Sequence, residues 1–186
     1  MKRSMITTAI CLLLVTAMLF SSCEDPAKEH MIKGNGYFGQ SQWDEAITEY
    51  SKAIELNPRL VEAYENRGMA YENGKDPDKA IIDYTKVVEL DPSNAFNYVR
   101  RALVYYYAKQ KYQETIVDCS AAIDLYSKLP SSAYNIRDFS AAYHVRGLGR
   151  EGMQDWNNAI ADYTKAIELN ANYTEAYLER GYTYLE

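Results

Sequence analysis

Hydrophobic and polar residues are arranged differently at the start of the chain and in the rest of it. Residues 5–20 are 16 consecutive positions without a charged side chain. Further along, small and aromatic residues return at fixed intervals between charged ones, in segments that superpose and begin at His30, Tyr64, Tyr98, Tyr143 and Tyr177. The steps between these starting points are 34, 34, 45 and 34 residues. A period of about 34 residues is typical of helix pairs that stack into a solenoid.

The aligned segments share small residues at two positions and tyrosine at three. In a numbering that places Tyr64 at position 4, position 8 is small, as are most residues at position 20: Gly34, Gly68, Ala102, Gly147 and Gly181, then Ala46, Ala80 and Ala159. Two antiparallel helices approach closely only where small residues cross, and large rings fill the space around the crossing. Positions 4, 11 and 24 hold 11 of the 18 tyrosines. The excess of tyrosine is therefore architectural.

These segments resemble tetratricopeptide repeats, position by position, from about residue 27 to the C-terminus. The resemblance implies an all-α fold, a right-handed superhelical solenoid of antiparallel helix pairs with about four and a half repeats. The repeats are expected at 27–60, 61–94, 95–128 and 140–173, with a partial repeat at 174–186 and an insert at about 129–139. The insert either lengthens the first helix of the fourth repeat, with a serine as its cap, or forms a surface loop.

Two further patterns concern the helices themselves. Arginine recurs at position 7 of four repeats, and we expect its methylenes to lie along the core while its charged end reaches water. Asp76 and Pro77 indicate a capped helix start, and Ser41 to Asp44 resembles a capping box. The arginines are Arg67, Arg101, Arg146 and Arg180.

The N-terminal stretch has the order of a secretory signal, with basic residues first, then apolar ones, then Ser21, Ser22 and Cys23. The stretch is short for a membrane-spanning helix. It resembles the lipobox of bacterial lipoproteins, in which the cysteine is acylated. The resemblance implies a signal peptide over 1–22, lipidation of Cys23, a linker over 23–26 and an extracytoplasmic location on a membrane of the bacterial cell envelope. The alternative is an ordinary cleaved signal in which Cys23 is incidental.

Charge and motifs argue against several other functions. The net charge of −6 lacks the basic footprint that nucleic-acid binding requires. Residues 34–39 match G-x-G-x-x-G, but a dinucleotide site needs a preceding strand, which the helical pattern excludes. His30 and His144 lie in different repeats, without metal-ligand spacing or a triad around them. We therefore expect no catalytic residues, no metal, no cofactor and no enzyme activity.

Function is expected to come from a surface. In the tetratricopeptide family the first helices line a concave groove that holds an extended or helical peptide. The resemblance implies a groove that is acidic in repeat two and aromatic and aliphatic in repeat three. The expected groove residues are Asn35, Phe38, Asn66, Met69, Phe96, Arg100, Leu103, Tyr106, Tyr107 and His144. We predict a lipid-anchored scaffold that binds protein or peptide partners; the alternative is a structural subunit or assembly factor of a cell-envelope complex.

A third hypothesis is capture of a peptide C-terminus, because Asn35, Asn66 and Arg100 match three of the five positions of the family's carboxylate clamp. Met31 and Phe96 replace its two lysines, and charge-assisted bonds to a carboxylate are the strong ones. This hypothesis is therefore the less favoured one.

The last segment carries Tyr177, Tyr184 and Leu185 without a second helix to cover them. This predicts either self-association through the C-terminal helix, giving a homo-oligomer, or a chain that continues beyond residue 186.

Overall fold

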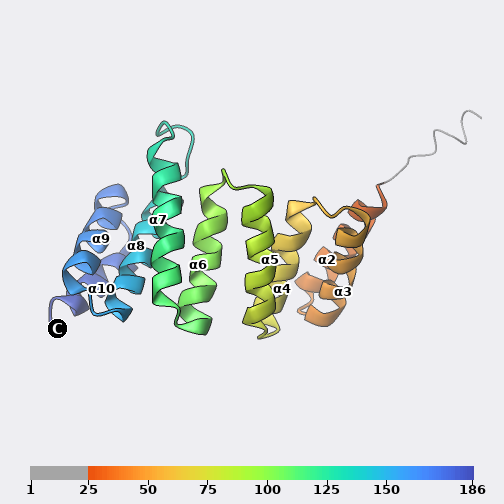
Figure 1. The fold of residues 1–186 in the computed structure, drawn as a ribbon, viewed down its shortest axis with the longest axis horizontal. Helices are drawn as coiled ribbons and strands as arrows, with labels where there is room; N and C mark the ends of the chain where they lie inside the picture. Colours follow the sequence, from red (N-terminus) through yellow and green to blue (C-terminus); the bar gives the residue numbers. More distant parts are fainter. Residues whose placement is uncertain (1–24) are drawn as a thin grey trace, which may run out of the picture.

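The computed structural model describes residues 25–186, so the predicted signal peptide and Cys23 lie outside the described residues. Residues 25–186 form nine α-helices, labelled as in Figure 1. They are α2 (Pro26–Gly39), α3 (Trp43–Leu56), α4 (Val61–Asn73), α5 (Pro77–Leu90), α6 (Ala95–Lys109), α7 (Tyr112–Ser127), α8 (Ile136–Gly152), α9 (Trp156–Leu169) and α10 (Thr174–Thr183). Within this part of the chain, none of the helices has the length and apolar character needed to cross a bilayer.

The helices stand side by side in a row that runs from α2 and α3 at one end to α9 and α10 at the other (Figure 1). Helices α2 and α3, α4 and α5, α6 and α7, and α8 and α9 pair with each other, and each second helix contacts the first helix of the next pair. This arrangement confirms the predicted all-α solenoid of antiparallel helix pairs.

Each helix pair crosses at the small residue of position 8. A Cβ atom added to Gly34 would lie 2.5 Å from the Tyr50 ring, and one added to Gly147 would lie 2.5 Å from the Tyr163 ring. Both rings are buried, so they cannot move aside freely. In the third repeat the same crossing uses a larger first residue, Ala102, and a smaller second one, Cys119. Glycine is therefore required where the partner is tyrosine.

The charged ends of three of the position 7 arginines do not extend freely into water as predicted, and their side chains are only 15 to 19% exposed. Each of these three guanidinium groups donates two hydrogen bonds, over 2.7 to 2.9 Å, to a buried aspartate at position 23 in the second helix of the same repeat. Its third contact is a hydroxyl in the second helix of the preceding repeat. The prediction that the charged end reaches water was wrong because the facing helix supplies a carboxylate that binds the guanidinium. The sets are Arg67, Asp83 and Ser51; Arg101, Asp118 and Thr85; and Arg146, Asp162 and Ser120.

The insert contains both of the expected features. Residues 128–135 form a loop that projects beyond the row (Figure 1), and α8 begins within the insert at Ile136. Asn135, not a serine, caps this helix by accepting a hydrogen bond from the backbone N–H of Arg137 at 3.0 Å. The Phe139 ring anchors the loop against Tyr134, with ring centroids 5.1 Å apart.

The other predicted caps differ in outcome. Asp76 caps α5, because its carboxylate accepts from the backbone N–H of Lys79, and Pro77 is the first helical residue, as predicted. The capping box at Ser41 is not formed: α3 follows Gln42 and has no hydrogen bond from a capping side chain. Ser41 has φ of 60°, so it belongs to the turn before the helix.

Candidate partner-binding groove

The tyrosines that cross each helix pair also hold side chains of the predicted groove. The Tyr50 hydroxyl donates to Asn35 Oδ1 at 2.8 Å, and the Tyr163 hydroxyl donates to Glu151 Oε2 at 2.6 Å. Burial raises the pKa of Tyr50 to about 12, so its hydroxyl keeps the proton that it donates. The hydroxyl of Tyr84 donates in the same way to Glu72. The groove side chains are therefore fixed from the core.

Repeats one and two bring two predicted residues together. Asn66 Nδ2 donates to Asn35 Oδ1 at 3.0 Å, although 31 residues separate them. A hollow of about 270 Å³ next to Asn35 is lined by residues from both repeats, among them Met31 and Glu62. Asn66 Nδ2 is already engaged with Asn35, and buried Met31 supplies no cation to this hollow. These contacts do not favour the capture of a carboxylate.

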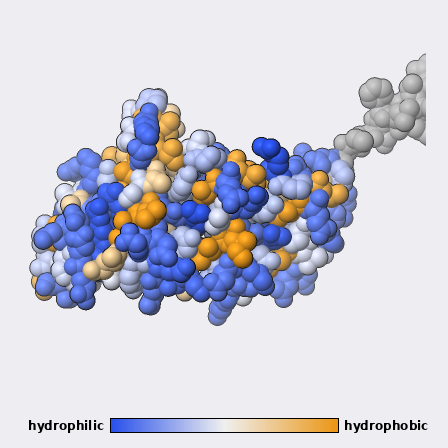
Figure 2. Space-filling view, in the orientation of Figure 1, coloured by the Kyte–Doolittle hydropathy of each residue, from blue (hydrophilic) through white to orange (hydrophobic). Residues whose placement is uncertain are grey.

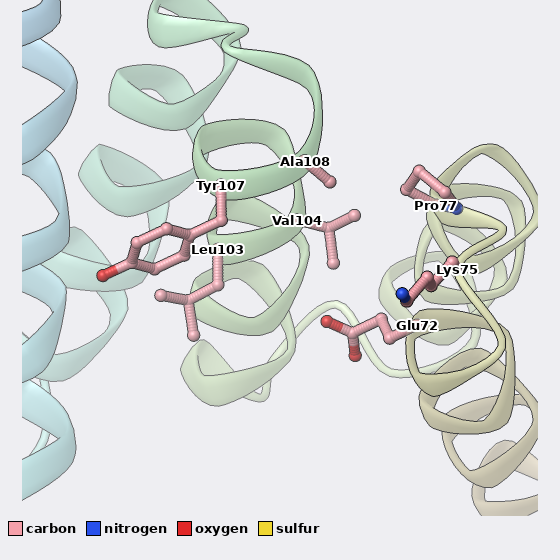
Figure 3. Close-up of a pocket in the computed structure, with 7 residues that line it drawn as sticks. All are labelled: Glu72, Lys75, Pro77, Leu103, Val104, Tyr107 and Ala108. Atoms are coloured by element: carbon pink, nitrogen blue, oxygen red, sulfur yellow. The ribbon is translucent and has the colours of Figure 1, made fainter.

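The second hollow lies between repeats two and three and has a volume of about 350 Å³. Figure 3 shows Val104 and Ala108 pointing from α6 toward Pro77, and Glu72 pointing across the opening to α6. The Tyr107 ring extends to the other side of α6 and is 70% exposed. The lining is Glu72, Lys75, Pro77, Leu103, Val104, Tyr107 and Ala108. This hollow offers an apolar wall with a carboxylate and an ammonium at its edge. We call it the central hollow.

Negative charge surrounds the central part of the groove. Burial raises the pKa of Glu65, and nearby Glu62 and Asp91 raise it further, whereas Arg100 lowers it. Arg100 itself lies over the Phe96 ring, with its guanidinium carbon 5.2 Å from the centroid. Arg100 thus stands among the carboxylates of Glu62, Glu65 and Asp91. An apolar segment that also carries basic residues would complement this surface.

Three other predicted residues are half-buried and pack mainly against neighbouring side chains of the fold. The Phe38 ring packs on Trp43 with centroids 5.0 Å apart, Met69 packs against the buried cluster around Tyr84, and Tyr106 packs against the cluster around Tyr163. Leu103 is also half-buried but lines the central hollow. Tyr107 and Leu103 are therefore the predicted residues that line the central hollow.

His144 is not available as a groove contact. It is only 7% exposed, and its Nδ1 shares a hydrogen bond of 3.1 Å with the Tyr173 hydroxyl. Burial lowers the pKa of His144 to about 4, so the imidazole is neutral at pH 7. This corrects the prediction, because Tyr173 from the loop before α10 covers a side chain that the repeat alignment placed on the open face.

The sequence pattern missed the hydrogen bonds that fix the groove side chains. Glu72 and Tyr84, like Glu151 and Tyr163, are 12 residues apart and hydrogen-bonded. A comparison of the repeats of this chain for pairs of polar positions that recur could have found that spacing. No such signal marks Val104 or Ala108, since small apolar residues recur throughout the repeats.

The face shown in Figure 2 is mainly hydrophilic, with hydrophobic residues gathered in separate groups along the row. On this face no continuous apolar strip connects the repeats.

Comparison with family models identifies the repeats. A model described as TPR repeat matches residues 34–74 and 153–186, and a model described as Tetratricopeptide repeat matches residues 61–94. Together with the stacked helix pairs, these matches decide the family. The chain belongs to the tetratricopeptide repeat family. The fold and these matches support a scaffold for protein interactions.

Several tetratricopeptide proteins are similar to this chain. Hsp70-Hsp90 organizing protein 3 of Arabidopsis thaliana is 47% identical over 45 residues, which are 24% of this chain and 8% of that protein. RNA polymerase II-associated protein 3 of Xenopus tropicalis is 30% identical over 144 residues, which are 77% of this chain and 15% of that protein. The crystal structure of MamA superposes with a TM-score of 0.74 at 26% identity, covering 86% of this chain and 81% of MamA. The chain thus spans only a small part of these two sequence relatives.

Proposed function

We propose that this tetratricopeptide protein is a lipid-anchored, extracytoplasmic scaffold that binds a protein or peptide partner in its groove. The central hollow supports this proposal most strongly, because it combines an apolar wall with an exposed aromatic ring and flanking charges. Such a site can bury an apolar side chain of the partner and orient its neighbours by hydrogen bonds. The acidic surroundings favour a partner segment with basic residues beside its apolar ones.

A site-specific photo-crosslinker tests the site of binding. Placed at Tyr107, it should form an adduct with one partner in intact cells, because this side chain is 70% exposed beside the hollow. The matched control places the crosslinker at Ile82, which is 66% exposed on the second helix α5. An adduct at Ile82 alone would refute binding in the groove. Equal adducts at both positions would favour the broad contacts of a structural subunit in an envelope complex.

A second variant tests whether the hollow itself is used. Ala108→Glu adds a carboxylate to the apolar wall beside Glu72. It should abolish the Tyr107 adduct, since a bound partner would bury this unpaired charge at a high cost in free energy. The fold of the variant is checked by circular dichroism. An undiminished adduct from a folded Ala108→Glu protein would show that the partner binds elsewhere.

The anchor is proposed from Lys2, Arg3, the uncharged stretch over 5–20 and Cys23. Cells that express the chain should incorporate a clickable fatty-acid analogue into it, and Cys23→Ala should remain unlabelled and leave the membrane fraction. Multiple acyl chains hold a protein stably at a bilayer, whereas one chain gives marginal binding. Labelling that persists in Cys23→Ala would remove the lipid anchor and leave the groove proposal intact.

A further inference from the structure

The insert and the start of α2 lie at the same edge of the row (Figure 1). Because the helices of each pair are antiparallel, every first helix begins at this edge and every second helix ends there. We call it the anchor edge. The segments that connect one pair to the next lie along it, and they are 57–60, 91–94, 128–135 and 170–173.

The proposed lipid is attached close to the anchor edge. Cys23 is two residues before Asp25, and two residues span at most about 7 Å even when fully extended. Asp25 caps α2, because its carboxylate accepts a hydrogen bond from the backbone N–H of Ala27 at 3.1 Å. Ala27 is buried, so the start of α2 is fixed to the fold. An acylated Cys23 would therefore hold this part of the anchor edge near the bilayer surface.

The insert carries two apolar side chains that the fold leaves partly exposed. Leu129 is 43% exposed, and Ile136, the first residue of α8, is 44% exposed. The aromatic rings nearby pack inside the insert: Tyr134 contacts Tyr126 and Phe139, with ring centroids 6.0 and 5.1 Å away. Figure 2 shows hydrophobic residues along one side of the projecting insert. The rings thus fix the insert, while its two aliphatic side chains face outward.

Basic side chains flank the two aliphatic ones. Lys128 and Arg137 stand on either side of them in the sequence, and Asp138 is the single acidic residue of 128–138, although the whole chain has a net charge of −6. Lys128 pairs with Asp124, but both side chains are more than half exposed, and such pairs are weak. Long basic side chains can lie along an apolar surface and keep their charged ends in water or at lipid phosphates. This combination suits the boundary between the headgroups and acyl chains of a bilayer.

We propose that the insert is a second membrane contact, made with the bilayer that holds the acylated Cys23. Leu129 and Ile136 enter the boundary between headgroups and acyl chains, and the flanking basic side chains stay at the headgroups. The insert projects beyond the row at the anchor edge, so it is placed to reach the bilayer ahead of the neighbouring connecting segments (Figure 1). The two contacts together hold the row lengthwise along the membrane. The second contact rests on the proposed lipid anchor, whereas it does not depend on the groove.

A fluorescent dansyl amino acid reports where the insert lies. It replaces Ala133, an exposed residue of the loop, in the full lipidated chain, which is reconstituted into phosphatidylcholine vesicles. The matched control carries the probe in place of Met153, which is 50% exposed at the opposite edge, about 25 Å away along α8. When nitroxide-labelled lipid is included, the probe at 133 should lose most of its fluorescence and the probe at 153 should keep it, because nitroxides quench only at close range.

Aspartate substitutions test whether the aliphatic side chains make the contact. The double variant Leu129→Asp, Ile136→Asp should restore most of the fluorescence at position 133, because a carboxylate is costly to desolvate at the boundary. Met153→Asp is the control and should leave the probe quenched. An aspartate at position 136 also suits the start of α8, and circular dichroism checks that the variants keep their helices.

Flotation of the vesicles through a density gradient distinguishes failure of the anchor from failure of the second contact. If the chain floats with the vesicles but the probe at 133 stays bright, the anchor stands and the insert is not a membrane contact. Equal quenching at 133 and 153, or undiminished quenching in the double aspartate variant, would overturn the second contact in the same way. A chain that does not float has no lipid anchor, and the second contact is then refuted together with it.

Discussion

Replacing Gly147 by alanine tests the crossing that sets the geometry of each repeat. The added Cβ would lie 2.5 Å from Cε1 of Tyr163, far inside a normal carbon contact. The ring is fully buried and its hydroxyl is bonded to Glu151, so it cannot turn away without losing that bond. Overpacking of this kind costs about 1–3 kcal/mol, against about 1 kcal/mol gained by removing a helical glycine. The contact of 2.5 Å places this variant in the upper half of the overpacking range, so we expect a net loss of about 1–2 kcal/mol in the free energy of unfolding.

The third repeat shows how the same crossing is built with other residues. Ala102 and Cys119, both fully buried, occupy the positions of Gly147 and Tyr163. Tyr163→Cys alone leaves a cavity and should cost about 3–5 kcal/mol, as for other large aromatic truncations. In the double variant Gly147→Ala, Tyr163→Cys, the added methyl no longer meets a ring. Its loss in the free energy of unfolding should therefore be about 1–2 kcal/mol smaller than the sum of the losses of the two single variants.

The assay is urea unfolding followed by far-ultraviolet circular dichroism. Gly36→Ala is the control, because its added methyl is in open space on α2. It should stabilise the protein by about 0.5–1 kcal/mol through the unfolded state and helix propensity. The reasoning would be refuted if Gly147→Ala were as stable as the unaltered chain, or if the double variant were the plain sum of the single ones.

Three further predictions follow from groups that the fold buries or constrains. Asp118→Ala leaves the largely buried Arg101 guanidinium without its carboxylate and with only the Thr85 hydroxyl as a partner, and it should lower the free energy of unfolding by about 3–5 kcal/mol. Glu89→Ala, in an exposed pair, should change it by less than about 1 kcal/mol in the same urea titration. Burial lowers the pKa of His144 to about 4, so the unfolded state gains a proton first as pH falls. Stability should therefore decrease from about pH 6.5 to pH 4, and His144→Gln should remove up to about 3 kcal/mol of that decrease, measured by urea unfolding at each pH. Identical pH profiles for His144→Gln and the unaltered chain would contradict the His144 prediction. Gln154 has φ of 61°, in the left-handed region, so Gln154→Gly should raise the melting temperature, with a gain of up to about 1 kcal/mol. A lower melting temperature for Gln154→Gly would contradict this second prediction.

Much of the fold could be predicted because one repeated pattern determines it. A glycine at position 8 and a tyrosine at position 24 specify a close crossing, and their recurrence at a fixed period specifies how the pairs stack. The charged residues were harder to interpret. Arg67 viewed alone fits a surface side chain, and only Asp83, 16 residues away on the facing helix, explains why its side chain is just 19% exposed.

The groove could be predicted only in outline. Tyr107 and Leu103 line a hollow, but the hollow also needs Val104 and Ala108 of the same helix and Pro77 of the preceding repeat. His144 shows the opposite case. Its position in the repeat predicts an open face, yet Tyr173, contributed by the next loop, covers it. Such contacts between repeats depend on irregular connecting segments, which the repeat pattern does not describe.

The arginine contacts have a mechanical consequence for the whole row. Arg67, Arg101 and Arg146 each bond their own second helix and, through a hydroxyl, the second helix of the preceding repeat. Each guanidinium thus connects three helices by hydrogen bonds. A force applied along the row would act on each of these arginine contacts in turn, and neighbouring repeats would share the strain before any one of them opened. Stretching the row should therefore be resisted at each of these boundaries by an arginine–hydroxyl hydrogen bond as well as by the packing of the two repeats.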